Sequence, residues 1–186
     1  MSTPPARFFA ADSASPADLD GGELRPYAID VSDGDQIVGV IADTHGLVRP
    51  EALAALAGVD RILHAGDVGS RAVLDALAAL APVTAVRGNN DHGAWAEALA
   101  DTADVELGGA RVHLLHDLKQ LALDPGAAGF RVVIAGHSHR AALTARGGVL
   151  YLNPGSAGPR RFNLPLSVAR LRVDAGEVRA EIVPLL

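Results

Sequence analysis

Residues 37–45 read Ile37-Val38-Gly39-Val40-Ile41-Ala42-Asp43-Thr44-His45, an apolar run that ends in polar side chains. A near-continuous apolar run is typical of a strand covered on both faces, as in a parallel sheet. In an extended backbone, residues i and i+2 point the same way, so we expect Asp43 and His45 to reach one point. Gly46 then allows a sharp turn. An aspartate at a strand end is often only a turn residue, and its pairing with His45 is what favours a metal site here.

The same sequence of apolar run, polar loop and helix occurs twice more. Strand-like runs at residues 61–65 and 82–86 lead into Gly66-Asp67 and into Gly88-Asn89-Asn90-Asp91. Three helices are expected. The first begins at Pro50 and has Leu53, Leu56 and Ala57 on one face. The second is capped by Ser70 and buries Val73, Leu74, Leu77 and Leu80, and the third is a short helix at residues 94–100. Alternating strands and helices imply a parallel, mostly buried sheet. Taken alone, Asp67 and Asn89 would pass for cap or turn residues.

The second half of the chain predicts hairpins. Strand-like runs flank glycine-containing turns at residues 105–107 and 111–115, 141–146 and 149–152, and 166–173 and 178–183, with a buried strand at residues 130–135. Helices first and hairpins later indicate two sheets packed face to face with helices outside.

Three histidines follow strands of this second half. His116 ends one strand, and a lone strand histidine is more often structural than catalytic. His137 and His139 follow Gly136 and repeat the i, i+2 spacing, so we expect two imidazoles on one side of a strand end. Ligands in parallel sheets gather outside the carboxyl ends of the strands, and the joint spacing of all these residues predicts a metal centre there.

Composition limits the other functions. The 186 residues suit one domain and contain no cysteine, so any metal must be held by His, Asp, Asn or Glu. A net charge of −6 argues against binding long nucleic acid but not small phosphorylated ligands. No apolar run approaches the ~20 residues that span a bilayer, and no signal-peptide pattern is seen, so we expect no membrane association and a cytoplasmic location. Whether the chain forms a homo-oligomer is left open.

Residues 1–35 differ from the remainder. They contain Pro4, Pro5, Pro16, Gly21 and Gly22 with no sustained period, which predicts a flexible extension before a domain at residues 36–186. A partner-binding tail is the alternative, and residues 27–31 could add an edge strand.

The ordered motifs resemble the calcineurin-like metallophosphoesterase superfamily, and the small size resembles its small bacterial and archaeal phosphodiesterase branch. The resemblance covers roughly residues 36–186 and rests on Asp43-x-His45, Gly66-Asp67, Gly88-Asn89-x-Asp91, His116, Gly136-His137-x-His139 and Asn153-Pro154-Gly155-Ser156. It implies an α/β fold, a four-layer α/β/β/α sandwich of two mixed sheets flanked by helices.

The resemblance also implies two divalent metal ions. One would be held by Asp43, His45, Asp67 and His139, and the other by Asp67, Asn89, His116 and His137, with Asp67 bridging them. Mn²⁺ is typical of the family, with Fe, Ni, Co or Zn as alternatives. The expected activity is hydrolysis of a small phosphodiester or nucleotide by in-line attack of a metal-bridging hydroxide. The candidate catalytic residues are Asn89, Asn90 and Asp91.

Five further positions bear on the mechanism, and four of them leave alternatives open. Many superfamily members have His where this chain has Asn90, and Asn cannot transfer a proton, so we expect a preference for diesters with good leaving groups. His92 could substitute, or be a surface residue. Asp117 could hydrogen-bond a ligand imidazole, crowd the substrate or cap a helix. Arg160 and Arg161 could clamp a phosphate or simply be solvated.

Two other functions compete with a phosphodiesterase. Some relatives of this fold are interaction scaffolds, including a subunit of an endosomal sorting complex, and their metal sites are impaired. The seven intact ligand positions argue against that reading here. A phosphomonoesterase is disfavoured by Asn90 but stays open.

Overall fold

The structure is a computed structural model, and it describes residues 35–161 and 163–185. The predicted extension and the edge strand expected at residues 27–31 therefore lie outside the described residues, except for Asp35. In the described part of the chain, no helix is long and apolar enough to cross a membrane.

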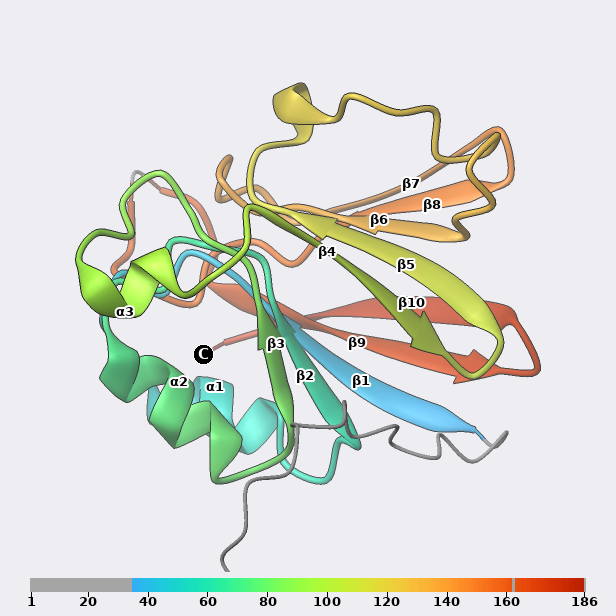
Figure 1. The fold of residues 1–186 in the computed structure, drawn as a ribbon. Helices are drawn as coiled ribbons and strands as arrows, with labels where there is room; N and C mark the ends of the chain where they lie inside the picture. The colour runs from blue at the N-terminus through green and yellow to red at the C-terminus, as the bar shows by residue number, and fades with distance from the viewer. Residues whose placement is uncertain (1–34, 162, 186) are drawn as a thin grey trace, which may run out of the picture. The chain divides into compact units, whose positions relative to one another are not determined.

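The first sheet has the strand order β10-β9-β1-β2-β3. Its parallel part consists of β1 (Gln36–Ile41), β2 (Arg61–His64) and β3 (Val83–Ala85), and its antiparallel part of β9 (Ser167–Asp174) and β10 (Glu177–Pro184). The helices α1 (Pro50–Ala55) and α2 (Arg71–Ala78) lie against its outer face (Figure 1).

The second sheet has the order β4-β5-β6-β8-β7 and faces the first (Figure 1). Its strands are β4 (Thr102–Leu107), β5 (Ala110–Leu115), β6 (Val132–Ile134), β7 (Ala142–Arg146) and β8 (Val149–Asn153). The short helix α3 (Ala94–Glu97) precedes β4, and the single-turn 3-10 helix η1 (Leu118–Gln120) follows β5. The predicted hairpins and the two-sheet sandwich are thus confirmed.

Three apolar layers hold this sandwich together, and they differ in size. The layer between the two sheets includes Val40, Leu63, Leu114 and Ile134, all fully buried. A second layer lies between the first sheet and its helices and includes Leu56, Ile62 and Leu77. The outer face of the second sheet carries a smaller apolar cluster of four buried residues, which are Leu115, Val133, Ala135 and Val149. Within the described residues the fourth layer is therefore reduced to η1 and connecting chain.

Several helix expectations were too long. Helix α2 ends at Ala78, so Leu80 is 39 % exposed instead of buried. Helix α1 ends at Ala55, so Ala57 is exposed beyond its last turn. Helix α3 covers residues 94–97 instead of 94–100. The apolar spacing continues past each helix end, and this explains why the pattern alone extended the helices too far.

Candidate metal centre

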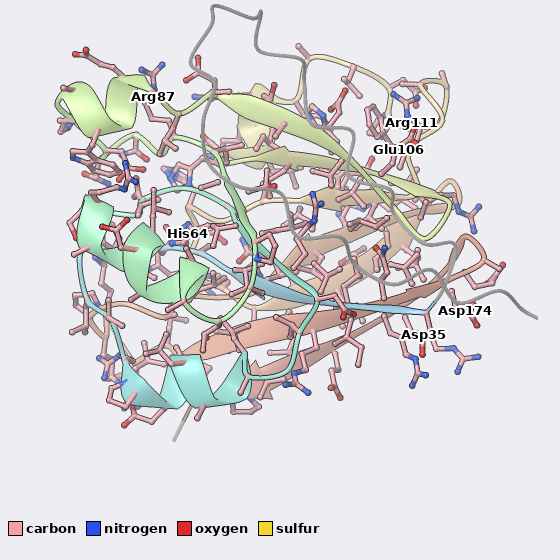
Figure 2. The ribbon with its side chains drawn as sticks, turned by 60° about the horizontal axis from the view of Figure 1, so that its bottom comes forward. Asp35, His64, Arg87, Glu106, Arg111 and Asp174 are labelled. Carbon is pink, nitrogen blue, oxygen red and sulfur yellow. The ribbon has the colours of Figure 1, made fainter. Side chains whose placement is uncertain are left out.

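The candidate ligands come together where β1, β2 and β3 end. Ile41 is paired with His64, and His64 with Ala85, so the three following loops start side by side. Figure 2 shows His64 at this end, whereas Asp35 and Asp174 mark the opposite end of the sheet. The loops after β5 and β6 reach the same edge, where the Gly136 amide donates to the His116 carbonyl at 3.0 Å.

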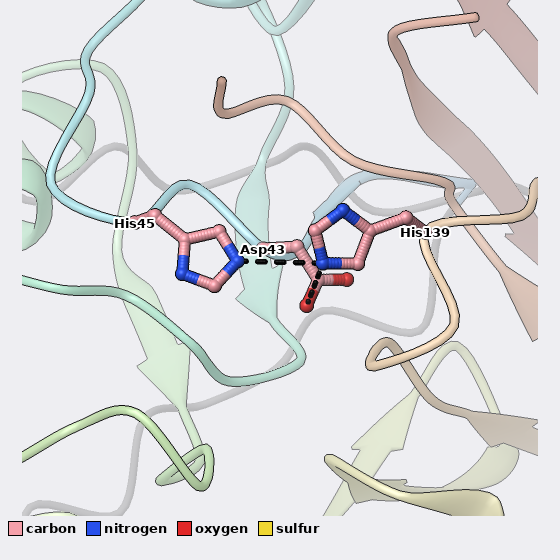
Figure 3. Close-up of side chains that lie close together, drawn as sticks. All are labelled: Asp43, His45 and His139. Carbon is pink, nitrogen blue, oxygen red and sulfur yellow. Dashed lines mark hydrogen bonds and ion pairs between the residues drawn. The ribbon is translucent and has the colours of Figure 1, made fainter. Parts of the chain in front are cut away.

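The first cluster joins Asp43, His45 and His139 (Figure 3). The Nε2 atoms of His45 and His139 lie 3.3 Å apart, and His139 Nε2 lies 3.4 Å from Asp43 Oδ1. Asp43 is fully buried, and His139 is 7 % exposed. Three ligand atoms thus converge from loops that are almost a hundred residues apart in the chain.

The second cluster gathers around His116. Its Nε2 atom lies 3.0 Å from Asn89 Oδ1, 3.4 Å from Asp67 Oδ2 and 3.3 Å from His137 Nδ1. Asn89 Oδ1 is also 3.0 Å from His137 Nδ1. Asp67 Oδ2 in turn reaches toward the first cluster, at 3.8 Å from His45 Nε2. Asp67 is therefore placed between the two clusters.

These spacings suit the edges of a metal coordination sphere. At a metal–ligand distance of about 2.1 Å, two ligand atoms are about 3.0 Å apart at a right angle and about 3.4 Å apart at a tetrahedral angle. The ligand–ligand distances within the clusters run from 3.0 to 3.4 Å. All seven predicted ligands are brought together in this way, five of them in groups that could hold a metal ion by their His and Asp atoms alone.

His137 and His139 separate, although the i, i+2 spacing predicted that they would share one side. His139 joins the first cluster and His137 the second. The reason is that neither residue is extended: both have positive φ, 65° and 57°. The argument from strand alternation was therefore wrong for this pair, whereas the division between two clusters agrees with the family resemblance.

Backbone strain concentrates at the ligands. Six non-glycine residues of the described chain have positive φ, and five of them are the candidate ligands Asp43, His45, Asp67, His137 and His139. Such residues cost about 1–3 kcal/mol each and persist only where the surroundings enforce them, typically at functional sites. Asp43 and His45 do share a cluster as predicted, but through left-handed turns and not through an extended strand end.

Asp43 is a buried carboxylate, and neither of its side-chain oxygens makes a hydrogen bond of ordinary geometry to the described residues. Burial raises the pKa of Asp43 to about 7. The nearby Asp67 charge adds to the rise, whereas the His116 charge and the His137 backbone N–H oppose it. An isolated buried carboxylate is costly, so a cation is the partner that this position lacks.

His116 shows the same requirement from the imidazole side. Its Nδ1 faces the Ala65 carbonyl at 2.8 Å, so Nδ1 carries the hydrogen and Nε2 presents a lone pair. That lone pair faces the oxygens of Asn89 and Asp67, which are acceptors too. Burial opposes charge on this ring, but the Asp67 and Ala65 contacts outweigh burial and raise the pKa of His116. Three acceptor atoms that face each other in this way need a proton or a metal ion between them.

The other ligands are tuned in the directions that metal binding needs. Burial would raise the pKa of Asp67, but the contact with His116 and the hydrogen bonds from Asn90 outweigh it and hold that pKa below its usual range. Burial lowers the pKa of His45, and burial with the His45 charge lowers the pKa of His139 to about 4. Neutral imidazoles and an ionised bridging carboxylate are the forms that bind cations.

Two glycines let the ligand loops approach each other. A Cβ on Gly88 would lie 2.0 Å from the Asp67 amide nitrogen, and a Cβ on Gly66 would lie 2.6 Å from His116 Nδ1. No side chain fits at either position without moving the loops. The Gly-Asp and Gly-Asn motifs therefore reflect close contact as much as turn geometry.

Asn90 and Asp91 are occupied by the protein itself. Asn90 donates to Asp67 from its backbone nitrogen at 2.8 Å and from its side-chain amide at 2.7 Å. The buried Asp91 carboxylate accepts from the backbone amides of Val68, Gly69 and Gly88 at 3.1, 2.7 and 2.8 Å. Asn90 thus orients the candidate bridging carboxylate, and Asp91 ties the loop after β2 to the loop after β3.

The remaining candidates take different places. Asp117 caps η1 by accepting from the Lys119 amide at 3.0 Å. Its other oxygen lies 3.8 Å from His137 Nε2, which is too long for a hydrogen bond, so the cap is the alternative that the structure bears out. His92 is exposed. Arg160 and Arg161 are both exposed, and the charge of Arg161 acts on Asp43, His45 and His139.

The turn at residues 153–156 supports the ligand loops. Asn153 Nδ2 donates to the Gly136 carbonyl at 2.7 Å, and Ser156 Oγ donates to the Asp43 carbonyl at 3.0 Å.

Sequence reasoning missed the buried pair His64 and Thr44. Thr44 Oγ1 donates to the Val68 carbonyl at 2.9 Å and lies 2.9 Å from His64 Nε2. This pair fixes the residue between the ligands Asp43 and His45. Burial lowers the pKa of His64 to about 4, so its ring is neutral. The one available signal was a histidine inside an otherwise apolar strand.

Known proteins share both the sequence and the fold. The calcineurin-like phosphoesterase superfamily domain matches residues 37–176. A probable metallophosphoesterase of Methanothermobacter thermautotrophicus is 37 % identical, over 79 % of this chain and 91 % of that protein. An archaeal phosphodiesterase matches with a TM-score of 0.66 and 23 % identity, over 79 % of this chain and 99 % of that one. Vps29 from Entamoeba histolytica, solved with zinc, matches with a TM-score of 0.63 and 26 % identity, over 81 % and 99 %. The chain belongs to the calcineurin-like phosphoesterase superfamily.

Proposed function

We propose that this chain is a phosphodiesterase that holds two divalent cations and hydrolyses a small phosphodiester or nucleotide. The observation that carries the proposal is the Asp43 carboxylate, which is fully buried, has no hydrogen-bond donor among the described residues, and lies 3.4 Å from a histidine nitrogen. A cation bound at this point would offset the free energy that burying an unpaired carboxylate costs. The second cluster offers a comparable place for another cation.

The residues present fit two metal ions. Asp43, His45 and His139 would hold one ion, Asn89, His116 and His137 the other, and Asp67 would bridge them. When bound, such a pair supplies an activated water and neutralises phosphate charge. Mn²⁺ is our proposed native metal, and the cytoplasm our proposed location. The mixed nitrogen and oxygen ligands alone do not select Mn²⁺ over other divalent metals.

The site is organised to attract an anion although the protein is acidic. Two divalent cations against the two ligand carboxylates leave the centre positive, while the whole chain carries a net charge of −6. Arg161 adds positive charge near Asp43, His45 and His139. A phosphodiester anion would be drawn to this edge of the sheet.

The contacts of Asn90 favour diesters with good leaving groups. Its amide already donates to Asp67, and an amide has no proton to transfer at neutral pH. Leaving groups that depart without protonation should therefore react best. This supports a phosphodiesterase over a phosphomonoesterase.

His92 provides the test of this point. We expect His92→Ala to show the same dependence of kcat/KM on leaving-group pKa as the wild type, because His92 is exposed in the loop beyond Asn90. Aryl phosphodiesters of graded leaving-group pKa measure the slope. A clearly steeper slope in the variant would identify His92 as the general acid.

A scaffold without catalysis is the second candidate, and the likeness to Vps29 is the observation that favours it. The deciding experiment measures the metal content of the purified protein and the hydrolysis of bis(p-nitrophenyl) phosphate with added Mn²⁺. We expect about two equivalents of bound metal and metal-dependent release of p-nitrophenol. If the purified protein binds no metal and stays inactive, the enzyme proposal is wrong and the scaffold proposal stands.

A further inference from the structure

An open groove of about 620 Å³ lies on the outer face of the second sheet. It runs over β6, β8 and β7, where the fourth layer is thin, and η1 contributes lining residues. A groove of this size suits a small organic ligand, since such sites typically measure 300–1,000 Å³. It is larger than the cavity of about 220 Å³ beside Asn89 and His116.

The floor of the groove is apolar and partly aromatic. Val133, Tyr151 and Thr144 are cross-strand neighbours on β6, β8 and β7, and all three line it. Two residues further along the strands, Arg146 is paired with Val149. The Arg146 guanidinium lies over the Tyr151 ring, and its Cζ atom is 5.6 Å from the ring centroid. An aromatic surface beside a guanidinium is suited to a flat ring with an attached anion.

The rim is cationic, in contrast to the chain as a whole. Lys119, Arg140 and Arg146 line the groove and are exposed, against the single carboxylate of Asp117. That carboxylate is already engaged by the Lys119 amide and lies near His137. A local excess of positive charge on a protein of net charge −6 indicates that the occupant is an anion.

The groove is continuous with the metal centre. Asp117 and His137 line both the groove and the smaller cavity that contains Asn89 and His116. Ser138 and Asn153 also line the groove, and Asn153 Nδ2 donates to Ser138 Oγ at 3.1 Å. A phosphodiester whose phosphate sits at the metal ligands can therefore extend one substituent directly into the groove.

We propose that this groove binds the organic half of the substrate and selects a flat group that carries a second phosphate, as in a nucleoside with phosphates at both ends. The ring would lie on Tyr151 and Val133, and the second phosphate would contact Arg140 and Arg146. This assignment rests on the proposed phosphodiesterase function and narrows its substrate class. Short nucleotide diesters fit this groove better than simple aryl diesters.

Two matched substrates test the assignment. They are the p-nitrophenyl ester of thymidine 5′-phosphate and the same ester with an added 3′-phosphate, and both release p-nitrophenol. We expect the 3′-phosphate to lower KM about tenfold in the wild type, as two exposed charge contacts would. The double variant Arg140→Gln/Arg146→Gln should lose this preference. Arg179→Gln removes an equally exposed charge from β10 and should keep it.

Binding provides a readout that does not depend on turnover. Calorimetry with thymidine 3′,5′-bisphosphate should show about tenfold weaker binding to the double variant than to the wild type and to Arg179→Gln. Equal KM for the two esters, or equal bisphosphate binding by all three proteins, would overturn the groove assignment. Metal-loaded protein that hydrolyses neither ester nor bis(p-nitrophenyl) phosphate would defeat the proposed function, while the binding comparison would still decide the groove.

Discussion

The ligand loops and the groove share His137 and Asp117, yet they are built in opposite ways. The ligand loops are joined backbone to backbone: the Asp43 amide donates to the Gly66 carbonyl at 3.0 Å, and the His45 amide to the Asp67 carbonyl at 2.9 Å. Their carboxylates are buried and their backbones left-handed. The cations of the groove, by contrast, are all exposed: Arg146 lies on β7, Lys119 on the single turn of 3-10 helix, and Arg140 in the loop directly after His139.

This difference suggests that the ligand loops serve the reaction itself, whereas the groove serves substrate recognition. Geometry that neighbouring loops enforce holds the metal ligands in one arrangement, which suits a reaction common to all substrates. Exposed long side chains can be substituted without disturbing the core of the protein, and they are suited to recognising one particular group of a substrate. Changes in the ligand loops should therefore affect every substrate, and changes in the groove only some.

Asp67→Asn should have the largest effect. The amide keeps the size of the carboxylate but loses the charge that lies between the two clusters. We expect kcat/KM for bis(p-nitrophenyl) phosphate to fall by about 10³-fold or more, about 4 kcal/mol of transition-state stabilisation, together with loss of bound metal. Asp75→Asn, which changes an exposed carboxylate on α2 paired with Arg71, is the matched control. Normal metal content and activity in Asp67→Asn would remove Asp67 from the centre.

Gly88→Ala tests whether close packing of the loops is essential. Its new Cβ would meet the Asp67 amide nitrogen at 2.0 Å and Asp67 Oδ1 at 2.2 Å. We expect a loss of about 3 kcal/mol in the free energy of unfolding and about 10²-fold lower activity on all substrates. Gly126→Ala is the control, because the nearest atom to its Cβ would be Asp124 Oδ1 at 3.4 Å. A Gly88→Ala protein with unchanged melting temperature and activity would show that the loops can separate freely.

Metal affinity should fall as the pH drops below 7. In the metal-free protein burial raises the pKa of Asp43 to about 7, so below that pH a proton must leave before a cation binds. We expect Mn²⁺ affinity to weaken about tenfold per pH unit between pH 7 and pH 5, and the protein to release at least one proton on binding. Calorimetry in buffers of differing ionisation enthalpy measures both. An affinity that does not change over this range would mean that Asp43 is already ionised.

Lys119→Gln should have the smallest effect. Lys119 is one exposed cation at the rim, so its loss should raise KM for the 3′-phosphorylated ester only about two- to threefold. The ester without the second phosphate is the internal control, since its KM should change less. A uniform loss of activity on both esters would place Lys119 with the catalytic loops and break the division between the two regions.

Sequence reasoning reached the ligands more reliably than their geometry. Apolar runs and glycine turns located the strands and hairpins, and the combined motifs marked seven candidate ligands that the fold brings together. The expectation that His137 and His139 share one side was wrong, because φ values of 65° and 57° are set by contacts between loops. The roles of Asn90 and Asp91 as supports for Asp67 and the neighbouring loops likewise depend on partners about twenty residues away.

By itself the sequence determined the family, the two-sheet sandwich and the ligand types, because periodicity and motif spacing are local properties of a chain. Only the tertiary structure decided that Asp43 has no hydrogen-bond donor among the described residues, that Asp67 lies between two clusters, and that a cationic groove adjoins the candidate metal centre. Lys119, Arg140 and Arg146 come from separate segments and form one surface only when β6, β7 and β8 are paired beside η1. The burial of a side chain, and the meeting of side chains from different loops, depend on segments that are far apart in the sequence. No local sequence pattern encodes them.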